Sequence, residues 1–180
     1  IYRLSSTAEE LDRIGEVELP AGAGPRHIEF HPTREFAYLT NELRSTLTVF
    51  KWNTDSGDLT KIQDVQTIPH RVSNTSADIH IHPSGDFVYG SNRGHNSIAA
   101  YRRLENGKLE SIEYQSTRGT CPRNFALDPT GEYLYAENQT SDTVVVFTVE
   151  LSTGSLSPTG DILSVPEPVC LKFFRELNDV

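Results

Sequence analysis

A glutamate and several arginines stand where a repeated segment of this sequence changes its charge. Glu42, Arg93 and Gln139 follow the same asparagine in successive copies of the segment, and Arg26 and Arg123 stand five residues before a His-Pro or Asp-Pro pair. A carboxylate can take a proton from water, while a guanidinium can stabilise an oxyanion or hold a phosphate. A scaffold needs the same residue in every copy, whereas a binding site needs different ones. These positions therefore predict a site for an anionic molecule, with Glu42 as a candidate base, Arg93 as a candidate donor to an oxyanion, and Arg26 and Arg123 as candidate ligands of the anion.

Three further polar residues are candidates for substrate contacts: Asp78, His80 and His95. His80 and His82 lie two residues apart on an expected strand and so share one face, a spacing that metal sites also use. Because His82 is accounted for by the proline turn that follows it, we expect no metal. We expect no cofactor either.

The elements that must position these residues are set by the repeat itself. The three asparagines are separated by 51 and 46 residues, and each follows a proline by nine residues and a tyrosine by three. About four short strands fit in each period, which is typical of the blades of a β-propeller. The recurring residues are Pro32, Pro83 and Pro129, Tyr38, Tyr89 and Tyr135, and Asn41, Asn92 and Asn138.

The repeat predicts an all-β chain that covers about half of a propeller ring. We expect a half-blade over residues 1–22, blades over about 23–75, 76–118 and 119–165, and the start of another blade over 166–180. Strands are expected at Gly15–Leu19 and Val169–Phe174. The recurring asparagines, and the residues before each proline (His31, His82 and Asp128), are expected to bond the backbone of their own turns. The absence of methionine, together with the blade count, predicts that this chain is a segment of a longer protein.

Composition narrows the possible partners. The net charge is −9, from 16 basic and 25 acidic residues, and an acidic surface repels nucleic acid and anionic membranes. No apolar run approaches the roughly 18 residues that span a bilayer. We therefore expect a cytoplasmic protein with neither nucleic acid nor membrane as a partner. The arginines named above add a small anionic substrate, and the incomplete ring adds the remaining blades, from upstream sequence or from another chain.

Four stretches carry a resemblance to a known family. They are GAGPRHIEFHP (22–32), NELRST (41–46), SADIHIHPSGDFVYGSNRGHNSIAAY (76–101) and CPRNFALDPTGEYLYAENQTSDTVVVF (121–147). Together they resemble the seven-bladed propeller lactonases, a family that includes bacterial-type 6-phosphogluconolactonase and carboxymuconate cyclase. The resemblance implies a site with an arginine, a glutamate and a second arginine at Arg26, Glu42 and Arg93. It also implies a histidine from an earlier blade, upstream of residue 1.

Three functions are open at this point. The first is hydrolysis of a sugar-phosphate lactone at the mouth of the propeller channel. The second is a lactonising cyclisation of a muconate, in which carboxylates replace the phosphate and the same arginines serve. The third is a propeller without catalysis that acts as a docking platform in a larger assembly.

Overall fold

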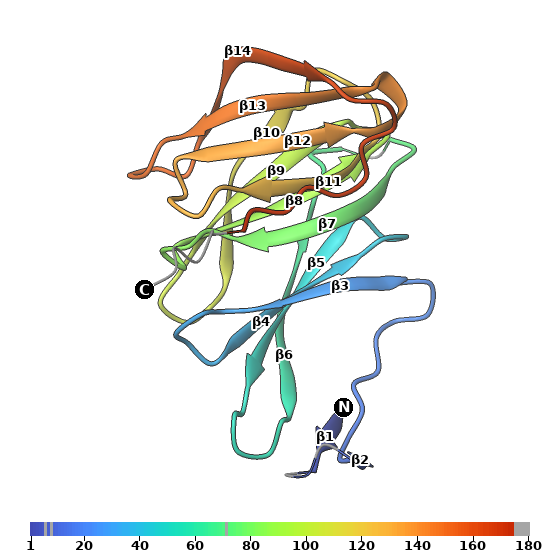
Figure 1. Ribbon diagram of the computed structural model, residues 1–180. Coiled ribbons are helices and arrows are strands. Elements are labelled where there is room, and N and C mark those ends of the chain that lie inside the picture. Colours follow the sequence, from blue (N-terminus) through green and yellow to red (C-terminus); the bar gives the residue numbers. More distant parts are fainter. Residues whose placement is uncertain (6, 8, 71, 175–180) are drawn as a thin grey trace.

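Short runs of alternating apolar residues form three four-stranded antiparallel sheets and one two-stranded sheet (Figure 1). The computed structural model describes the chain except residues 6, 8, 71 and 175–180. The expectation of an all-β propeller chain is confirmed. The strands are β1 (Tyr2–Leu4) and β2 (Leu11–Arg13); β3 (Pro25–Phe30), β4 (Phe36–Asn41), β5 (Thr46–Trp52) and β6 (Leu59–Gln66); β7 (Thr75–Ile81), β8 (Phe87–Arg93), β9 (Ser97–Arg103) and β10 (Leu109–Ser116); and β11 (Pro122–Leu127), β12 (Tyr133–Asn138), β13 (Thr143–Val149) and β14 (Leu156–Ser164).

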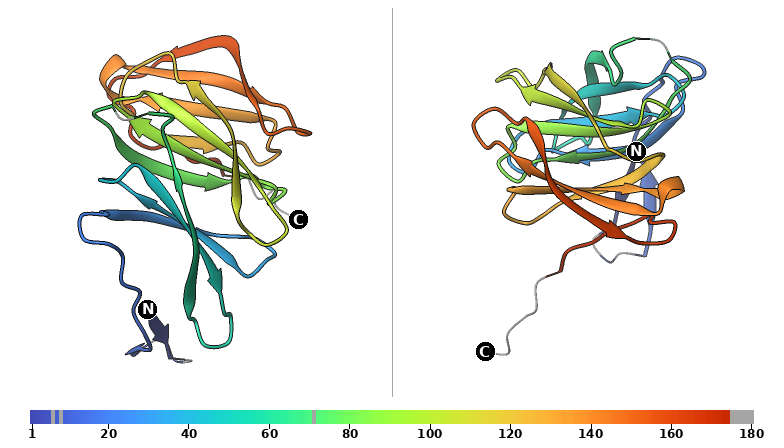
Figure 2. Two further views of the ribbon diagram at one scale, coloured as in Figure 1. Left: turned by 180° about the vertical axis from the view of Figure 1, so that it is seen from behind. Right: turned by 90° about the horizontal axis from the view of Figure 1, so that it is seen from above.

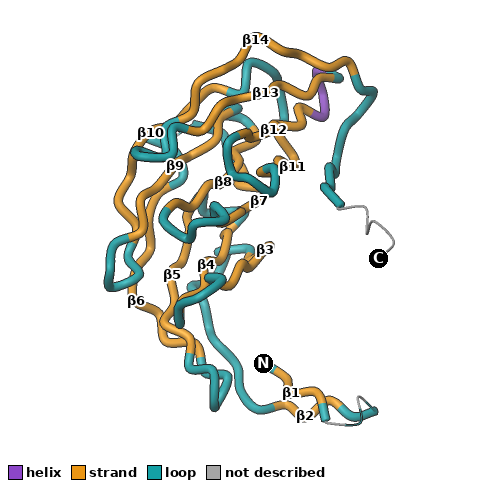
Figure 3. The backbone as a smooth tube through the Cα atoms, turned by 60° about the vertical axis from the view of Figure 1, so that its left-hand side comes forward, coloured by secondary structure: helices purple, strands orange, loops and turns teal. Residues whose placement is uncertain are grey.

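The three large sheets are arranged as successive leaves of an arc. Figure 3 shows β3, β7 and β11 along its concave side and β6, β10 and β14 along its convex side. Each sheet keeps the chain order of its strands, and the views in Figure 2 show the same stacking of one sheet on the next. The first strand of each large sheet therefore faces the interior of the arc, where a propeller has its channel. Within the part of the chain that the structure describes, no helix is long and apolar enough to cross a membrane.

Two apolar cores hold the leaves together. Tyr38, Leu47 and Val49 of the first large sheet pack against Ile79 and Val88 of the second. An equivalent cluster joins the second and third sheets, and its members include Phe87, Tyr89, Phe125, Leu134 and Phe147. The recurring tyrosines reach further, since the Tyr38 hydroxyl donates to the Gly107 carbonyl at 3.1 Å and the Tyr89 hydroxyl to the Gly154 carbonyl at 2.9 Å.

In the first two large sheets, the histidine before the proline turn also hydrogen-bonds to the following sheet. His31 Nδ1 accepts the backbone N–H groups of Thr33 and Arg34 at 3.1 and 3.0 Å, which confirms the predicted bond to its own turn. Its other nitrogen, Nε2, donates to the Gly85 carbonyl of the following sheet at 3.0 Å. His82 repeats both bonds, to the backbone of its own turn and to the Gly131 carbonyl at 3.0 Å. Only the turn bond was predicted.

Replacing Gly85 by alanine is expected to lower the free energy of unfolding by more than the same change at Gly22. Both glycines have positive φ, +80° and +77°, so alanine is strained at either position. A Cβ on Gly85 would lie 2.5 Å from His31 Nε2, whereas a Cβ on Gly22 would meet nothing within 4 Å. The difference between the two variants in urea denaturation measures the inter-sheet contact, and we expect about 1–3 kcal/mol. Equal losses would show that this contact contributes nothing.

Two expectations about local structure are wrong. The recurring asparagines do not bond the backbone of their own turns: Asn41 Nδ2 donates to the hydroxyls of Thr46 and Thr48, and Asn92 Nδ2 donates to the Thr67 carbonyl at 2.6 Å. Thr67 lies in the segment that links the first large sheet to the second. The asparagine of the second sheet therefore bonds to this linking segment and not to its own turn. Asn138 repeats this with the Thr117 carbonyl at 3.1 Å.

Two of the predicted strands are also absent. The early strand lies at Leu11–Arg13 instead of Gly15–Leu19, because Leu11–Arg13 is the run that pairs with β1. Residues 169–174 form no strand. The Leu171 N–H there donates to the Asn124 side chain at 3.2 Å, in place of the backbone ladder that a strand requires.

Candidate functional site

A register shift occurs at the same place in each innermost strand. It lies between Pro25 and Ile28 in β3, between Ser76 and Ile79 in β7, and between Pro122 and Asn124 in β11. A β-bulge bends a strand and redirects its side chains. The residues within or beside these bulges include Arg26 and Arg123, which the repeat comparison singles out, together with His27, Asp78 and Asn124. The same local distortion of the backbone therefore occurs in all three sheets where the candidate residues lie.

Glu42 and Arg93 are in direct contact. Arg93, the last residue of β8, donates through Nη2 to Glu42 Oε1, and Arg26 Nε lies 3.7 Å from the other carboxylate oxygen. Both arginines also donate to backbone carbonyls of β7: Arg26 to Ala77 at 2.6 Å and Arg93 to Ser76 at 3.4 Å. The predicted trio is therefore one cluster that joins two sheets. Within the described chain, the buried Nε of Arg93 has no hydrogen-bond partner.

A second cluster is built around Asp78, whose side chain is only 3% exposed. His27 Nδ1 donates to Asp78 Oδ1 at 2.6 Å, and His80 Nε2 donates to Oδ2 at 3.0 Å. Asn124 of β11 also donates to Oδ2. Because a carboxylate can only accept, each of these histidine nitrogens must carry a proton. The His27 ring is oriented in this way, with its side chain still 45% exposed.

Mutual hydrogen bonding sets the charges in this cluster. Burial alone would raise the pKa of Asp78, but the bonds from His80 and His27 lower it to about 2. Burial would lower the pKa of His80, but the bond to Asp78 and the Glu29 carboxylate 3.5 Å from its other nitrogen raise it to about 9. At neutral pH the Asp78–His80 pair is therefore an aspartate and an imidazolium.

Acid should weaken the fold through Asp78. Its folded pKa of about 2 lies below the ordinary value of 3.8, so its stabilisation is complete above pH 4 and is lost as the pH falls toward 2. The shift corresponds to about 2 kcal/mol of unfolding free energy. Urea denaturation of wild type and Asp78→Asn at pH 5 and pH 2.5 should show a steeper loss in wild type. Parallel losses would mean that the hydrogen bonds do not favour the charged carboxyl.

The second cluster and Arg26 line one cavity of about 600 Å³. Its walls come from β3, β7, β11 and the segment 169–172. Arg123 and Lys172 add two cations to Arg26, so an anion in this cavity would meet positive groups from three directions. The lining residues with ionisable or amide side chains are Arg26, His27, Glu29, Asp78, His80, Arg123, Asn124 and Lys172.

The structure does not bring His95 to this cavity. The chain turns at Gly94, which has a φ of +115°, and the His95 ring then lies 5.8 Å from His70 and 6.4 Å from Tyr114. Its Nδ1 meets the Ser97 hydroxyl at 2.8 Å. His80 and His82 also have separate partners, Asp78 and Gly131.

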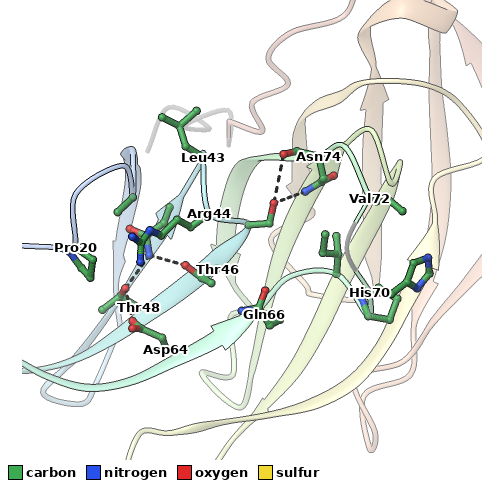
Figure 4. Close-up of a pocket in the computed structure, with 15 residues that line it drawn as sticks. Pro20, Leu43, Arg44, Thr46, Thr48, Asp64, Gln66, His70, Val72 and Asn74 are labelled. Atoms are coloured by element: carbon green, nitrogen blue, oxygen red, sulfur yellow. Dashed lines mark hydrogen bonds between the residues drawn. The ribbon is translucent and has the colours of Figure 1, made fainter.

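Another cavity, of about 720 Å³, lies elsewhere. Figure 4 shows Thr46, Thr48, Asp64 and Gln66 along its wall. Asn74, in the loop after β6, also lines the cavity and donates a hydrogen bond to the Ser45 hydroxyl. Because Leu47 and Val49 of β5 pack toward the second large sheet, the alternating Thr46 and Thr48 face the opposite side. Its lining includes none of Arg26, Glu42, Arg93 and Asp78, so it is not the candidate site.

The comparison of the repeats misses residues that have counterparts in the other copies, His27 and Glu137, and a residue outside the repeated strands, Lys172. His27 aligns with Asp78 and Asn124, one place after the compared arginines, and this differing position would have identified it. Glu137 of β12 aligns with Thr40 and Ser91, and it is buried, with 1% exposed. Lys172 could not be found from the repeat, because it reaches the cavity from a segment that is not a strand.

Known proteins that are similar to this chain have the same propeller architecture. Residues 1–173 match the family described as "Lactonase, 7-bladed beta-propeller". The 6-phosphogluconolactonase of Bacillus subtilis (strain 168) is 38% identical over 170 residues, which is 93% of this chain and 49% of that protein. A crystal structure of a protein from Lactobacillus plantarum has a TM-score of 0.92 at 36% identity, covering 97% of this chain and 51% of that one. The periplasmic gluconolactonase PpgL of Pseudomonas aeruginosa has a TM-score of 0.89 at 30% identity, covering 97% and 50%.

The chain spans about half the length of the curated relatives that it matches. The match nevertheless runs through all three large sheets and through both clusters of the cavity. The chain belongs to the seven-bladed β-propeller lactonase family.

Proposed function

We propose that this chain supplies the catalytic side of a propeller that hydrolyses a sugar-phosphate lactone. The observation that carries the proposal is the His27–Asp78 hydrogen bond of 2.6 Å on the wall of a cavity that also holds Arg26. An imidazole fixed by a buried carboxylate is a suitable base for water. A guanidinium beside it can stabilise the charge that develops on the carbonyl oxygen.

In this proposal His27 takes the proton from the attacking water. Its Nδ1–H is bound to Asp78, so the lone pair of the neutral ring lies on Nε2. Arg26 Nη1 donates to that Nε2 at 3.3 Å, a contact that the attacking water has to replace. The sequence-predicted base, Glu42, already has two arginines beside its carboxylate. Glu42 then acts mainly by holding those arginines in place, and it remains the alternative base.

The cationic side chains of the site interact with the two negative groups of the reaction, the oxyanion and the substrate phosphate. Arg26, which lines the cavity, is the proposed donor to the oxyanion. Arg93 is proposed to act beside it through their shared contact with Glu42, and its buried Nε has no partner in the described chain. Arg123 and Lys172 line the same cavity from β11 and the segment beyond β14. They are the proposed ligands of the substrate phosphate, because cations on two separate elements can hold its oxygens.

A paired assay tests the substrate class. The polypeptide that carries the complete ring would be given 6-phosphogluconolactone and, separately, a carboxymuconolactone, with acid release followed in a pH-stat. Turnover of the phosphorylated lactone is expected, with a lower kcat/KM when the phosphate is absent. Turnover of the muconolactone alone would favour the cyclase, and turnover of neither would favour the docking platform.

The proposed partners are the blades that complete the ring. Their support is the share of each relative that this chain leaves uncovered, about half. A cytoplasmic location remains a prediction, and one related structure is titled a periplasmic gluconolactonase.

A further inference from the structure

Glu137 is a buried carboxyl that the fold does not require. It is the residue before Asn138 on β12 and is 1% exposed. Neither of its carboxyl oxygens has a hydrogen-bond partner among the described residues. Burying a carboxyl without a partner is costly. Thr40 and Ser91 occupy this place in the other two large sheets, so a blade can be built there with a small hydroxyl residue.

Glu137 lies directly behind the Asp78 cluster. It is the cross-strand partner of Asn124, and residues paired in this way project from the same face of a sheet. The Asn124 side chain donates to Asp78 Oδ2, which places Glu137 one residue away from the carboxylate that orients His27. The charged groups that act on it are Asp78 and His80 from β7 and Lys172 from the segment beyond β14.

These surroundings make the charge of Glu137 variable near neutral pH. Burial and the negative charge of Asp78 raise its pKa to about 7, against the opposing positive charges of His80 and Lys172. Below that pH the carboxyl is neutral, and the single charge of Asp78 acts on both histidines. Above it, the proton leaves to solvent and a second negative charge appears behind the cluster, which strengthens the attraction of the His80 imidazole for its proton.

We propose that Glu137 is a positioning residue that sets the charge behind the Asp78 cluster, and thereby the hydrogen bond that orients His27, through the Asn124–Asp78 contact. This rests on the proposed function, in which His27 is the base. Glu137 does not line the cavity, so it acts on the base and not on the substrate. Its effect is therefore expected in kcat and in its pH dependence, while KM is unchanged.

The direct test is an NMR titration of this chain without substrate. The side-chain carboxyl carbon of Glu137 should titrate near pH 7, and the signal should be absent in Glu137→Gln. The ring nitrogens of His80 should have a higher titration midpoint in wild type than in Glu137→Gln, because only wild type gains the second negative charge. A Glu137 midpoint near 4.5, or a His80 midpoint that does not change, would overturn the proposal.

Kinetics in the complete ring give the second readout. Glu137→Gln should match wild type at pH 6 and have about tenfold lower kcat at pH 8, with KM within about twofold. Glu137→Thr, which restores the residue of the first large sheet, should behave in the same way. A purely structural role would lower kcat equally at both pH values, which would contradict the proposal. A His80 midpoint that shifts as expected in a ring without lactonase turnover would overturn the proposed function alone.

Discussion

Replacing Arg93 by alanine is expected to lower kcat/KM for the phosphorylated lactone by about 100-fold or more in the complete ring, as the loss of one oxyanion donor does. The variant loses the bond to Glu42 and also the buried Nε donor that has no partner within the described residues. Arg26 would remain, so binding should weaken less than turnover. Steady-state kinetics on a folded variant, with folding checked by circular dichroism, measure the effect.

The matched control for this prediction is Arg44→Ala. Arg44 is in the loop after β4, two residues beyond Glu42, and its exposed guanidinium donates to the Ala21 carbonyl at 2.9 Å. It carries the same charge, but Arg93, and not Arg44, is bonded to Glu42 among the described residues. Removing it should leave kcat/KM within about twofold, as is usual for surface substitutions. If the two variants lose the same activity, the effect comes from net charge and Arg93 has no special place in the site.

Replacing Asp78 by asparagine is expected to lower kcat by about 100-fold to 10,000-fold, the range that general acid–base catalysis supplies. An asparagine amide can donate to His27 Nδ1, which then has to accept. The proton of the neutral ring then moves to Nε2, the nitrogen proposed to receive the proton from water. The change therefore removes the base without removing the histidine. Kinetics and the ring-nitrogen chemical shifts of His27 would report the two effects together.

Asp64→Asn provides the comparison for Asp78. Asp64 also has a pKa held below its ordinary value, where bonds from Lys61 and Thr48 overcome its burial, but it lies in the other cavity. Its replacement should leave kcat unchanged. Were Asp78→Asn equally active, His27 would not be the base, and Glu42→Gln would become the decisive variant.

The repeat predicts the sheets well because its markers are the residues that join one sheet to the next. Tyr38 and His31 recur as Tyr89 and His82, and each makes its inter-sheet bond in both places. A residue with the same task in every blade produces a visible period. The strand expected at 169–174 is absent because a strand also requires a neighbouring strand to pair with, and the residues of the segment itself do not show whether one is present.

The site was only partly predictable, because it depends on differences between blades. Opposite charges after equivalent asparagines correctly suggested that Glu42 and Arg93 belong together, although their roles remain predictions. The same comparison overlooked His27 and Glu137 because it was applied at two positions only. His95 follows Arg93 closely in sequence, yet the glycine between them turns the chain and separates the two in space. Backbone direction of this kind cannot be read from charge.

The change from histidine to aspartate in the third large sheet has a mechanical consequence. His31 and His82 each donate a proton forward to a glycine carbonyl of the following sheet. Asp128 stands at the same place, and its carboxylate accepts only bonds from its own turn, including the Thr130 N–H at 3.1 Å. An ionised carboxylate has no proton to donate. A sheet packed after the third leaf would therefore receive no such hydrogen bond from this position, and under heat or pulling force we expect that junction to separate before the two junctions that have the bond.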